Sequence, residues 1–169
     1  MKNYLKEGLF LTLALLPLLV MFKFWAAIPE EMPIHWNANF EIDGYSSKMH
    51  AFYLLLALNI GLYLVFLIAP FIDPKKQNME LSKKAFIYIR LATTLLISIL
   101  SFSIVLYSTE FAIDSYKILS IGLPLLFMII GNFLPKMRKN YFVGIRTPWT
   151  LSNEEVWKKT HSLGGKVWF

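Results

Sequence analysis

The sequence contains no cysteine among its 169 residues, which excludes disulfide bonds and thiolate metal sites. It is also poor in charge, since only 17% of the residues are Asp, Glu, Lys or Arg, whereas 56% are hydrophobic. A soluble domain of this length has too small an interior to bury so much apolar surface. The composition therefore predicts an integral membrane protein.

Four apolar runs are long enough to cross a hydrocarbon layer of about 30 Å, which needs roughly 17 to 25 residues. They cover residues 9–25, 51–72, 85–107 and 118–134. The strict alternation of a membrane β-barrel is missing, and within a single segment only a helix satisfies its own backbone polar groups in lipid. We therefore predict an all-α fold, an integral membrane bundle of four transmembrane helices. No small-x-small cleavage pattern follows the first run cleanly, so we expect this run to be retained.

We expect one structural domain with three parts. Residues 1–72 hold the first helix pair with an external loop at 26–50, residues 73–134 hold the second pair, and residues 135–169 follow the last helix. The distribution of Lys and Arg predicts the orientation. With a cytoplasmic amino terminus, thirteen of the 17 basic residues are internal, three are external (Lys23, Lys48 and Lys117), and Arg90 lies within the third apolar run. The net charge of +6 thus indicates orientation rather than a nucleic-acid partner, and it places residues 131–165 in the cytoplasm.

The external loop carries residue types suited to binding. Asp43 and Gly44, flanked by Ile42 and Tyr45, predict a tight hairpin turn. We predict recognition of a ligand by His35, Trp36, Asn37, Asp43, Gly44 and Lys48. Two alternatives remain: a polar cap over the helix ends, and a zinc site, for which the loop offers His35, Glu41, Asp43 and His50 without a closely spaced histidine pair.

Three polar residues lie within the apolar runs: Asn59, Arg90 and Asn132. A charged side chain at mid-bilayer costs at least about 2.5 kcal/mol, so Arg90 is a candidate functional residue. It either extends to the cytoplasmic interface or pairs within the bundle. We expect Asn59 to form a hydrogen bond with another helix.

The segment after the fourth run is dense in basic, aromatic and turn-forming residues. Pro135 places the helix exit near Leu134, and the basic residues that follow are expected at anionic lipid headgroups. Ser152 and Glu155 form a capping-box pattern, which predicts an amphipathic interfacial helix over about 153–163, ended by Gly164 and Gly165. Within that helix Trp157 and His161 either stack or face lipid.

The run NYFVGIRTPWTLSNEEVWKKTH (140–161) resembles the signature of the SdpI family of bacterial membrane immunity proteins. The loop IPEEMPIHWNANFEIDGYSSK (28–48) is similar to the amino-terminal module of unknown function in that family. The carboxyl-terminal signature residues are Asn140, Tyr141, Gly144, Arg146, Thr147, Pro148, Trp149, Ser152, Glu155, Trp157 and His161.

The resemblance implies a non-enzymatic, multi-pass protein of the bacterial cytoplasmic membrane that protects its producer against a secreted toxic peptide. It also implies a link to a cytoplasmic transcriptional repressor, and family members usually continue through two further helices. No cofactor and no catalytic residue follow from it. The alternative hypothesis is a membrane-embedded metal-dependent hydrolase that uses His35, His50, or Glu155 with His161.

Overall fold

The computed structural model describes residues 2–37, 39, 41–109 and 115–169, and it divides into two compact units. The first comprises Met1–Tyr63 and Thr94–Gly122, and the second comprises Leu64–Thr93 and Leu123–Phe169. Three of the long helices contribute residues to both units.

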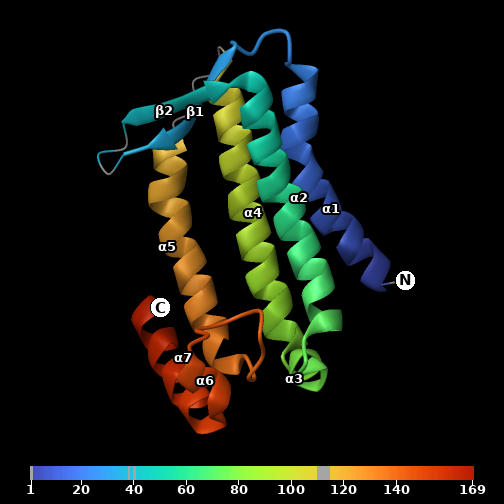
Figure 1. Ribbon diagram of the computed structural model, residues 1–169, viewed down its shortest axis with the longest axis vertical. Helices are drawn as coiled ribbons and strands as arrows, with labels where there is room; N and C mark the ends of the chain where they lie inside the picture. Colours follow the sequence, from blue (N-terminus) through green and yellow to red (C-terminus); the bar gives the residue numbers. More distant parts are fainter. Residues whose placement is uncertain (1, 38, 40, 110–114) are drawn as a thin grey trace. The chain divides into compact units, whose positions relative to one another are not determined.

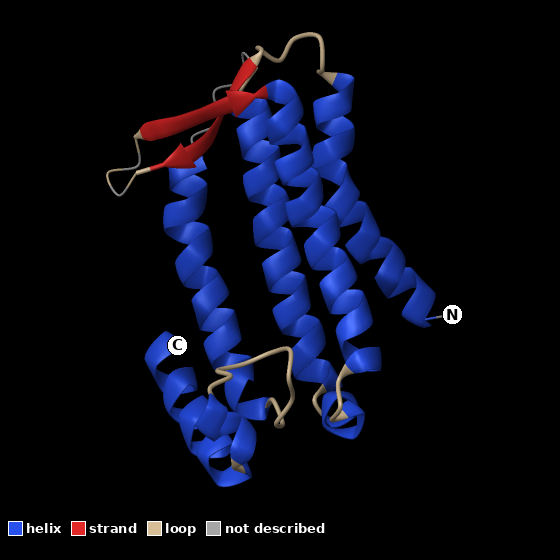
Figure 2. Cartoon of the chain, in the orientation of Figure 1, coloured by secondary structure: helices blue, strands red, loops and turns tan. Residues whose placement is uncertain are grey.

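Among the described residues, four helices are long and apolar enough to cross a membrane. They are α1 (Lys2–Lys23), α2 (Lys48–Ile72), α4 (Lys83–Tyr107) and α5 (Ser115–Phe133), seen in Figure 1. Each contains most or all of one of the four predicted apolar runs, and Figure 2 shows that helix dominates the chain. The predicted fold class is therefore confirmed.

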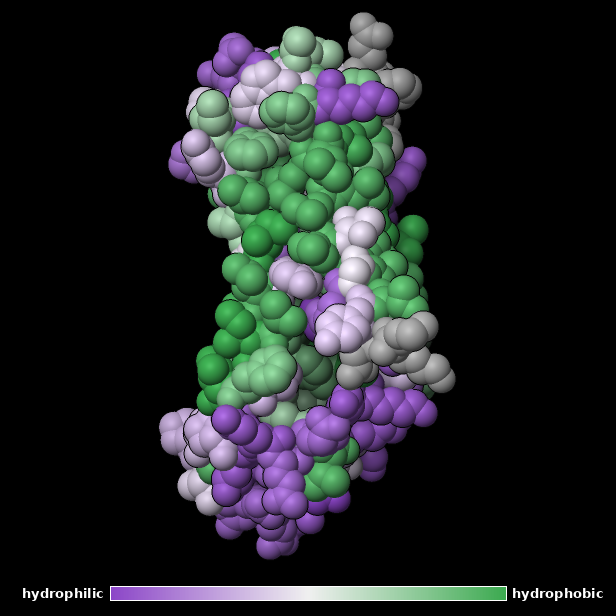
Figure 3. Space-filling model, turned by 90° about the vertical axis from the view of Figure 1, so that its right-hand side faces the viewer, coloured by the Kyte–Doolittle hydropathy of each residue, from purple (hydrophilic) through white to green (hydrophobic). Residues whose placement is uncertain are grey.

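Large apolar side chains remain exposed along these helices. Phe22, Phe71 and Ile121 are 75%, 68% and 63% exposed, and hydrophobic residues cover most of the helical surface in Figure 3. So extensive an apolar surface is unfavourable in water but suits a hydrocarbon surrounding. The helices thus have the surface of a multi-pass membrane protein.

In the core of the first unit, buried side chains at the ends of the helices pack against the segment between α1 and α2. That segment forms the antiparallel strands β1 (Glu31–Trp36) and β2 (Ile42–Ser47), and β2 continues directly into α2. The fully or nearly buried members of this core are Leu18, Met21, Ile28, Met32, Ala51, Leu55 and Val105. Burial of Ile28 and Met32 fixes the base of the hairpin onto the helices.

The second unit ends in short elements that follow the long helices. They are α3 (Lys76–Leu81), the 3-10 turn η1 (Leu134–Lys136), α6 (Pro148–Ser152) and α7 (Glu154–Trp168). The α5 helix stops at Phe133, as Pro135 predicts. Figure 1 shows α7 running beside the end of α5, where Trp168 meets Phe127 with ring centroids 5.4 Å apart.

Candidate functional site

The hairpin between α1 and α2 closes at Asn37, not at the predicted Asp43-Gly44 turn. The Asn37 backbone N–H donates to the Glu41 carbonyl at 2.9 Å, and its side-chain oxygen accepts from the N–H groups of Asn39 and Glu41 at 2.8 and 3.0 Å. An asparagine side chain that bonds its own downstream backbone stabilises a turn. Asp43 and Gly44 therefore lie inside β2, and that prediction was wrong.

Gly44 and Asp43 instead shape the surface around His35. Gly44 pairs with His35 across the strands, and a Cβ at Gly44 would lie 2.9 Å from the His35 Cβ, so a larger residue would push the strands apart. Asp43 Oδ1 lies 2.6 Å from His35 Nδ1, and both side chains are exposed. The predicted recognition residues His35 and Asp43 thus form one polar pair on the hairpin surface, next to the half-buried Trp36.

Lys48 has a different role from the one predicted. It is only 7% exposed, and its amine donates to the carbonyls of Ile28 and Trp25 at 3.1 and 3.3 Å and pairs with Glu30 at 3.0 Å. These bonds tie the start of α2 to the chain that leaves α1. Lys48 therefore holds the hairpin in place and presents little surface to a ligand.

The described residues give the zinc alternative little geometric basis. Among them, no three His, Asp or Glu side chains are grouped so that they could hold a metal ion. Four loop residues have side chains that could bind zinc. Among them, His35 and Asp43 form a hydrogen bond with each other, whereas Glu41 accepts a hydrogen bond from the Asn37 amide at 3.2 Å.

The three polar residues of the apolar runs differ in their surroundings. Asn59 is buried and donates to the Ser101 hydroxyl at 2.7 Å, which is the predicted bond between helices. Arg90 is 4% exposed and enclosed by protein, which favours pairing within the helices over extension to the interface. Asn132 is exposed and accepts from Lys136 at 3.3 Å, one turn further along the chain.

Asn140 organises the loop between η1 and α6. It is fully buried, donates to the carbonyls of Arg138 and Val143 at 2.9 and 3.0 Å, and accepts from the N–H groups of Phe142 and Val143 at 2.9 and 2.7 Å. The side chain thus uses both amide donors and its oxygen on the backbone of its own loop. Asn140 is therefore a structural residue of the signature.

Trp157 and His161 form the centre of this carboxyl-terminal segment. Both are 1% exposed, and their rings stack with centroids 3.9 Å apart and 20° between planes, so the stacking alternative is confirmed. The Trp157 indole donates to the Met137 carbonyl at 2.8 Å. Gly144 lies against this pair with φ +126°, and a Cβ there would collide with His161 Nε2 and lie 3.1 Å from the indole.

The hydrogen bonds of His161 define its protonation. Nε2 accepts from the Ile145 N–H at 3.0 Å, so it carries no proton, and Nδ1 then donates to the Trp157 carbonyl at 2.8 Å. Burial lowers the pKa of His161 below its usual value, and the bond to the Trp157 carbonyl opposes that shift. The imidazole is therefore neutral, and its Nε2 atom accepts a hydrogen bond from the backbone.

The helix caps differ from the prediction. Ser152 is the last residue of α6, where its hydroxyl donates to the Trp149 carbonyl at 3.0 Å, so it does not cap α7. Asn153 caps α7 by accepting from the N–H groups of Glu155 and Val156 at 2.8 and 3.2 Å. The real capping box is formed by Thr147 and Thr150 at the start of α6. Adjacent Ser and Asn are both good caps, and only the backbone decides between them.

Gly164 and Gly165 do not end α7, which continues to Trp168 and so extends past the predicted 153–163. A Cβ at Gly165 would lie 2.5 Å from the Pro135 ring and 2.8 Å from the Gly131 carbonyl. A Cβ at Gly131 would lie 2.9 Å from the backbone at Trp168. Gly131 and Gly165 thus allow close contact between the end of α5 and α7, and neither Gly164 nor Gly165 ends the helix.

Other signature residues remain accessible around this buried centre. Tyr141 is 40% exposed and Trp149 is 62% exposed. Arg146 is exposed and donates to the Tyr141 carbonyl at 2.6 Å, while the Tyr141 N–H donates to Asp73 at 2.8 Å. The remaining exposed members are Pro148, Ser152 and Glu155, of which Glu155 pairs with Lys159 at 2.8 Å.

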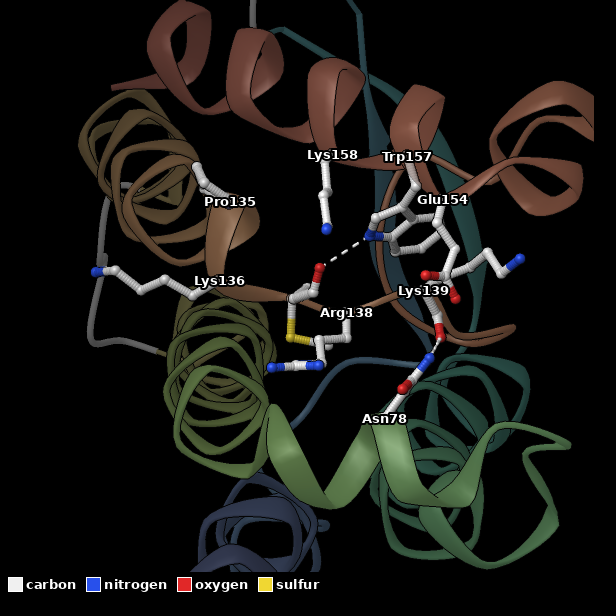
Figure 4. A pocket seen from close by; sticks show the side chains of 9 residues that line it. Asn78, Pro135, Lys136, Arg138, Lys139, Glu154, Trp157 and Lys158 are labelled. Atoms are coloured by element: carbon white, nitrogen blue, oxygen red, sulfur yellow. Dashed lines mark hydrogen bonds between the residues drawn. The ribbon is translucent and has the colours of Figure 1, made fainter.

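A pocket of about 320 Å³ lies between η1, the following chain, α3 and α7. Figure 4 shows Lys158 directed into this α7 pocket, while Lys136 extends away from it. The other charged side chains along its walls are those of Arg138, Lys139 and Glu154. The pocket is polar and mainly basic, and it lacks the histidine and carboxylate pairs of a hydrolytic site.

Sequence reasoning missed two residues that hold the segment. Asp73 is fully buried and accepts from the N–H groups of Lys75 and Tyr141 at 2.6 and 2.8 Å. Asn78 donates to the Lys139 carbonyl at 2.8 Å. The available signal for Asp73 was a carboxylate followed by proline directly after an apolar run, since Asp readily accepts from the backbone beyond a helix end.

The structure thus defines a class: a multi-pass membrane protein with a shaped hairpin between its first two long helices and a buried Trp-His centre after the last. Residues 136–169 match the SdpI/YfhL protein family, and residues 12–60 match a domain family of unknown function, DUF1648. These matches confirm the resemblance to the SdpI family and to its amino-terminal module.

One relative matches almost the whole chain. The Immunity protein SdpI of Bacillus subtilis (strain 168) is 27% identical over 168 residues, which cover 99% of this chain and 76% of that protein. No solved structure matches the chain at a significant level.

Proposed function

We propose that this protein is a bacterial membrane immunity protein that protects its cell against a secreted toxic peptide without catalysing a reaction. The observation that carries the proposal is the match of 99% of the chain to a protein named for immunity. The family matches at 12–60 and 136–169 support it, because they cover the hairpin and the Trp-His centre.

In this proposal the hairpin faces outward and meets the peptide. The orientation is supported by the excess of Lys and Arg in the opposite connections. Contact is made by the exposed side chains of His35 and Asp43 and by the half-buried Trp36, whereas Asn37, Gly44 and Lys48 shape the hairpin itself.

The test is survival of a toxin-sensitive bacterium that expresses the chain. We expect increased survival in the presence of the peptide, and the His35→Ala/Asp43→Ala double variant should lose protection while it still reaches the membrane. Ser46→Ala, on the same strand as Asp43, is the matched control. Unchanged killing of cells that hold the intact protein in the membrane would contradict the proposal.

The proposal includes recruitment of a cytoplasmic transcriptional repressor by the carboxyl-terminal segment. Exposed Arg146 and Trp149 support this role, since Arg and Trp are enriched among the energetically dominant residues of interfaces. The probe is a fluorescent fusion of a repressor encoded beside this gene. It should move to the membrane when the peptide is present and stay in the cytoplasm with Arg146→Ala/Trp149→Ala; no movement with the native chain would contradict recruitment.

A further inference from the structure

A second cavity in the same unit as the α7 pocket lies between the start of α4 and the end of α5. It measures about 440 Å³ and is lined by Leu81, Ala85, Tyr88, Phe133 and the basic residues Lys84 and Lys136, with Ser82 completing the wall. We call it the α4–α5 groove. All of its lining belongs to the second unit.

The groove lies where two candidate membrane spans end. One span begins at Lys83 and the other ends at Lys136, and both are predominantly apolar, with Arg90 as the charged residue in the interior of the first. With these two spans placed across a bilayer, a cavity at their ends lies at the level of the headgroups and not at the bilayer centre.

One wall of the groove is aromatic. Tyr88 of α4 stacks on Phe133 of α5 with centroids 4.6 Å apart and only 9° between the ring planes. Tyr88 is still 43% exposed, and the small Ala85 lies one turn before it along α4. This wall offers apolar contact to a ligand that enters from the lipid side.

The rim of the groove is cationic. Lys84 and Lys136 are both exposed, and the Lys136 amine lies 4.7 Å from the Phe133 ring centroid and donates to Asn132 at 3.3 Å. No carboxylate lines the groove among the described residues, and the nearby Glu80 pairs with Lys83 at 2.8 Å. Positive charge above an apolar wall complements a group that is anionic at one end and apolar at the other.

We propose that the α4–α5 groove binds one anionic phospholipid at a defined site. Its phosphate is held by the amines of Lys84 and Lys136, and its glycerol and upper acyl carbons lie against Tyr88 and Phe133. The volume accommodates a headgroup and the first methylenes of a lipid whose tails remain in the bilayer. The site is distinct from the general attraction of basic loops to an anionic membrane surface, because it needs the aromatic wall as well as charge.

The test uses native mass spectrometry of the full chain, purified in a neutral detergent and offered phosphatidylglycerol or phosphatidylcholine with the same acyl chains. We expect one phosphatidylglycerol to bind with marked preference. Lys84→Gln/Lys136→Gln should lower that affinity roughly 30-fold. This factor corresponds to the loss of two lysines that each contribute the binding free energy typical of a basic residue beside anionic lipid. Lys159→Gln/Lys166→Gln removes the same charge from α7 and should have no effect.

Two more measurements distinguish this site from attraction by charge alone. Tyr88→Ala should weaken phosphatidylglycerol binding although every lysine is kept, and inorganic phosphate at constant ionic strength should not displace the lipid. Equal binding of the two lipids, equal loss in the two lysine double variants, or displacement by phosphate would overturn the proposal. Thermal melting in lipid-free detergent verifies that each variant is folded, and protection against a toxic peptide is not part of the readout.

Discussion

At the scale of single residues, the carboxyl-terminal signature divides into residues that build the segment and residues that remain accessible. Asn140, Trp157 and His161 use their polar groups on backbone carbonyls and N–H groups within the segment. Arg146 and Trp149 are exposed at its surface. Substitutions in the first group should change stability, and Trp149→Ala should change binding, whereas Arg146→Ala also removes the bond to the Tyr141 carbonyl.

Gly144 offers a sharp test of this division. Its φ of +126° and the nearby Trp157 and His161 leave no room for a side chain, so Gly144→Ala should destabilise the protein by about 2 kcal/mol or more. Gly61→Ala is the matched control, because a Cβ at Gly61 meets nothing within 4 Å and alanine favours helix. Thermal melting in detergent measures both; equal melting temperatures for the two variants would contradict the structure.

His161 predicts a pH dependence. Its pKa is lowered by burial, so the unfolded chain binds more protons than the folded one between the folded pKa and the ordinary value of 6.5. The stabilisation by neutral His161 is therefore complete above pH 6.5 and is lost as the pH falls through the lowered pKa. Protonation of Nε2 would also remove the acceptor of the Ile145 N–H.

The measurement is the melting temperature at a series of pH values from about 8 to about 5, compared between the native chain and His161→Phe. Phenylalanine keeps an aromatic ring beside Trp157 but does not titrate. The native chain should lose its advantage over the variant as the pH falls. A stability difference that is constant over this range would show that His161 does not titrate with folding.

At the scale of elements, the long helices could be predicted because about twenty apolar residues in a row have only one common solution in lipid. The hairpin turn and the start of α7 could not, because Asn37, Asp43-Gly44, Ser152 and Asn153 are all good turn or cap residues. The choice among them depends on which backbone groups tertiary packing leaves unpaired. For the same reason Gly164 and Gly165 resemble a helix end in the sequence, although Gly165 serves close packing on Pro135.

The cap of α7 can be tested directly. Asn153→Ala removes the acceptor of two N–H groups and should cost about 1 kcal/mol, whereas Ser152→Ala removes one exposed hydroxyl bond within α6 and should cost little. Melting of the two single variants compares them under identical conditions. A larger loss of stability for Ser152→Ala than for Asn153→Ala would instead support Ser152 as the cap of α7, as the sequence pattern predicted.

At the scale of the whole molecule, composition and charge distribution predict membrane insertion and orientation, while the sites depend on contacts between distant parts of the chain. Asp73 and Tyr141 lie 68 residues apart and still share a hydrogen bond, which no local pattern indicates. The pairing of His35 with Asp43 likewise depends on strand register. The recognition residues on the hairpin and in the signature remain predictions.

The absence of cysteine makes the predicted orientation simple to measure. Single variants Ser47→Cys in the hairpin and Ser162→Cys in α7, both at exposed positions, introduce one thiol each into a chain that has no other. In intact cells a membrane-impermeant maleimide should label the first and not the second, and permeabilised cells should show labelling of both. The opposite pattern would show that the orientation is the reverse of the predicted one. Labelling of both positions in intact cells would contradict the prediction that an odd number of membrane-spanning helices separates them.

Lys48 gives the folded hairpin a chemical signature. Its amine is enclosed by two carbonyls and Glu30, whereas Lys23, at the end of α1 before the hairpin, is exposed. In the predicted orientation, an amine-reactive reagent added to intact cells will therefore acylate Lys23 long before Lys48 while the hairpin stays packed on its helices. The rate at which Lys48 is modified thus reports opening of the hairpin, and it can be compared in living cells with and without the proposed toxic peptide.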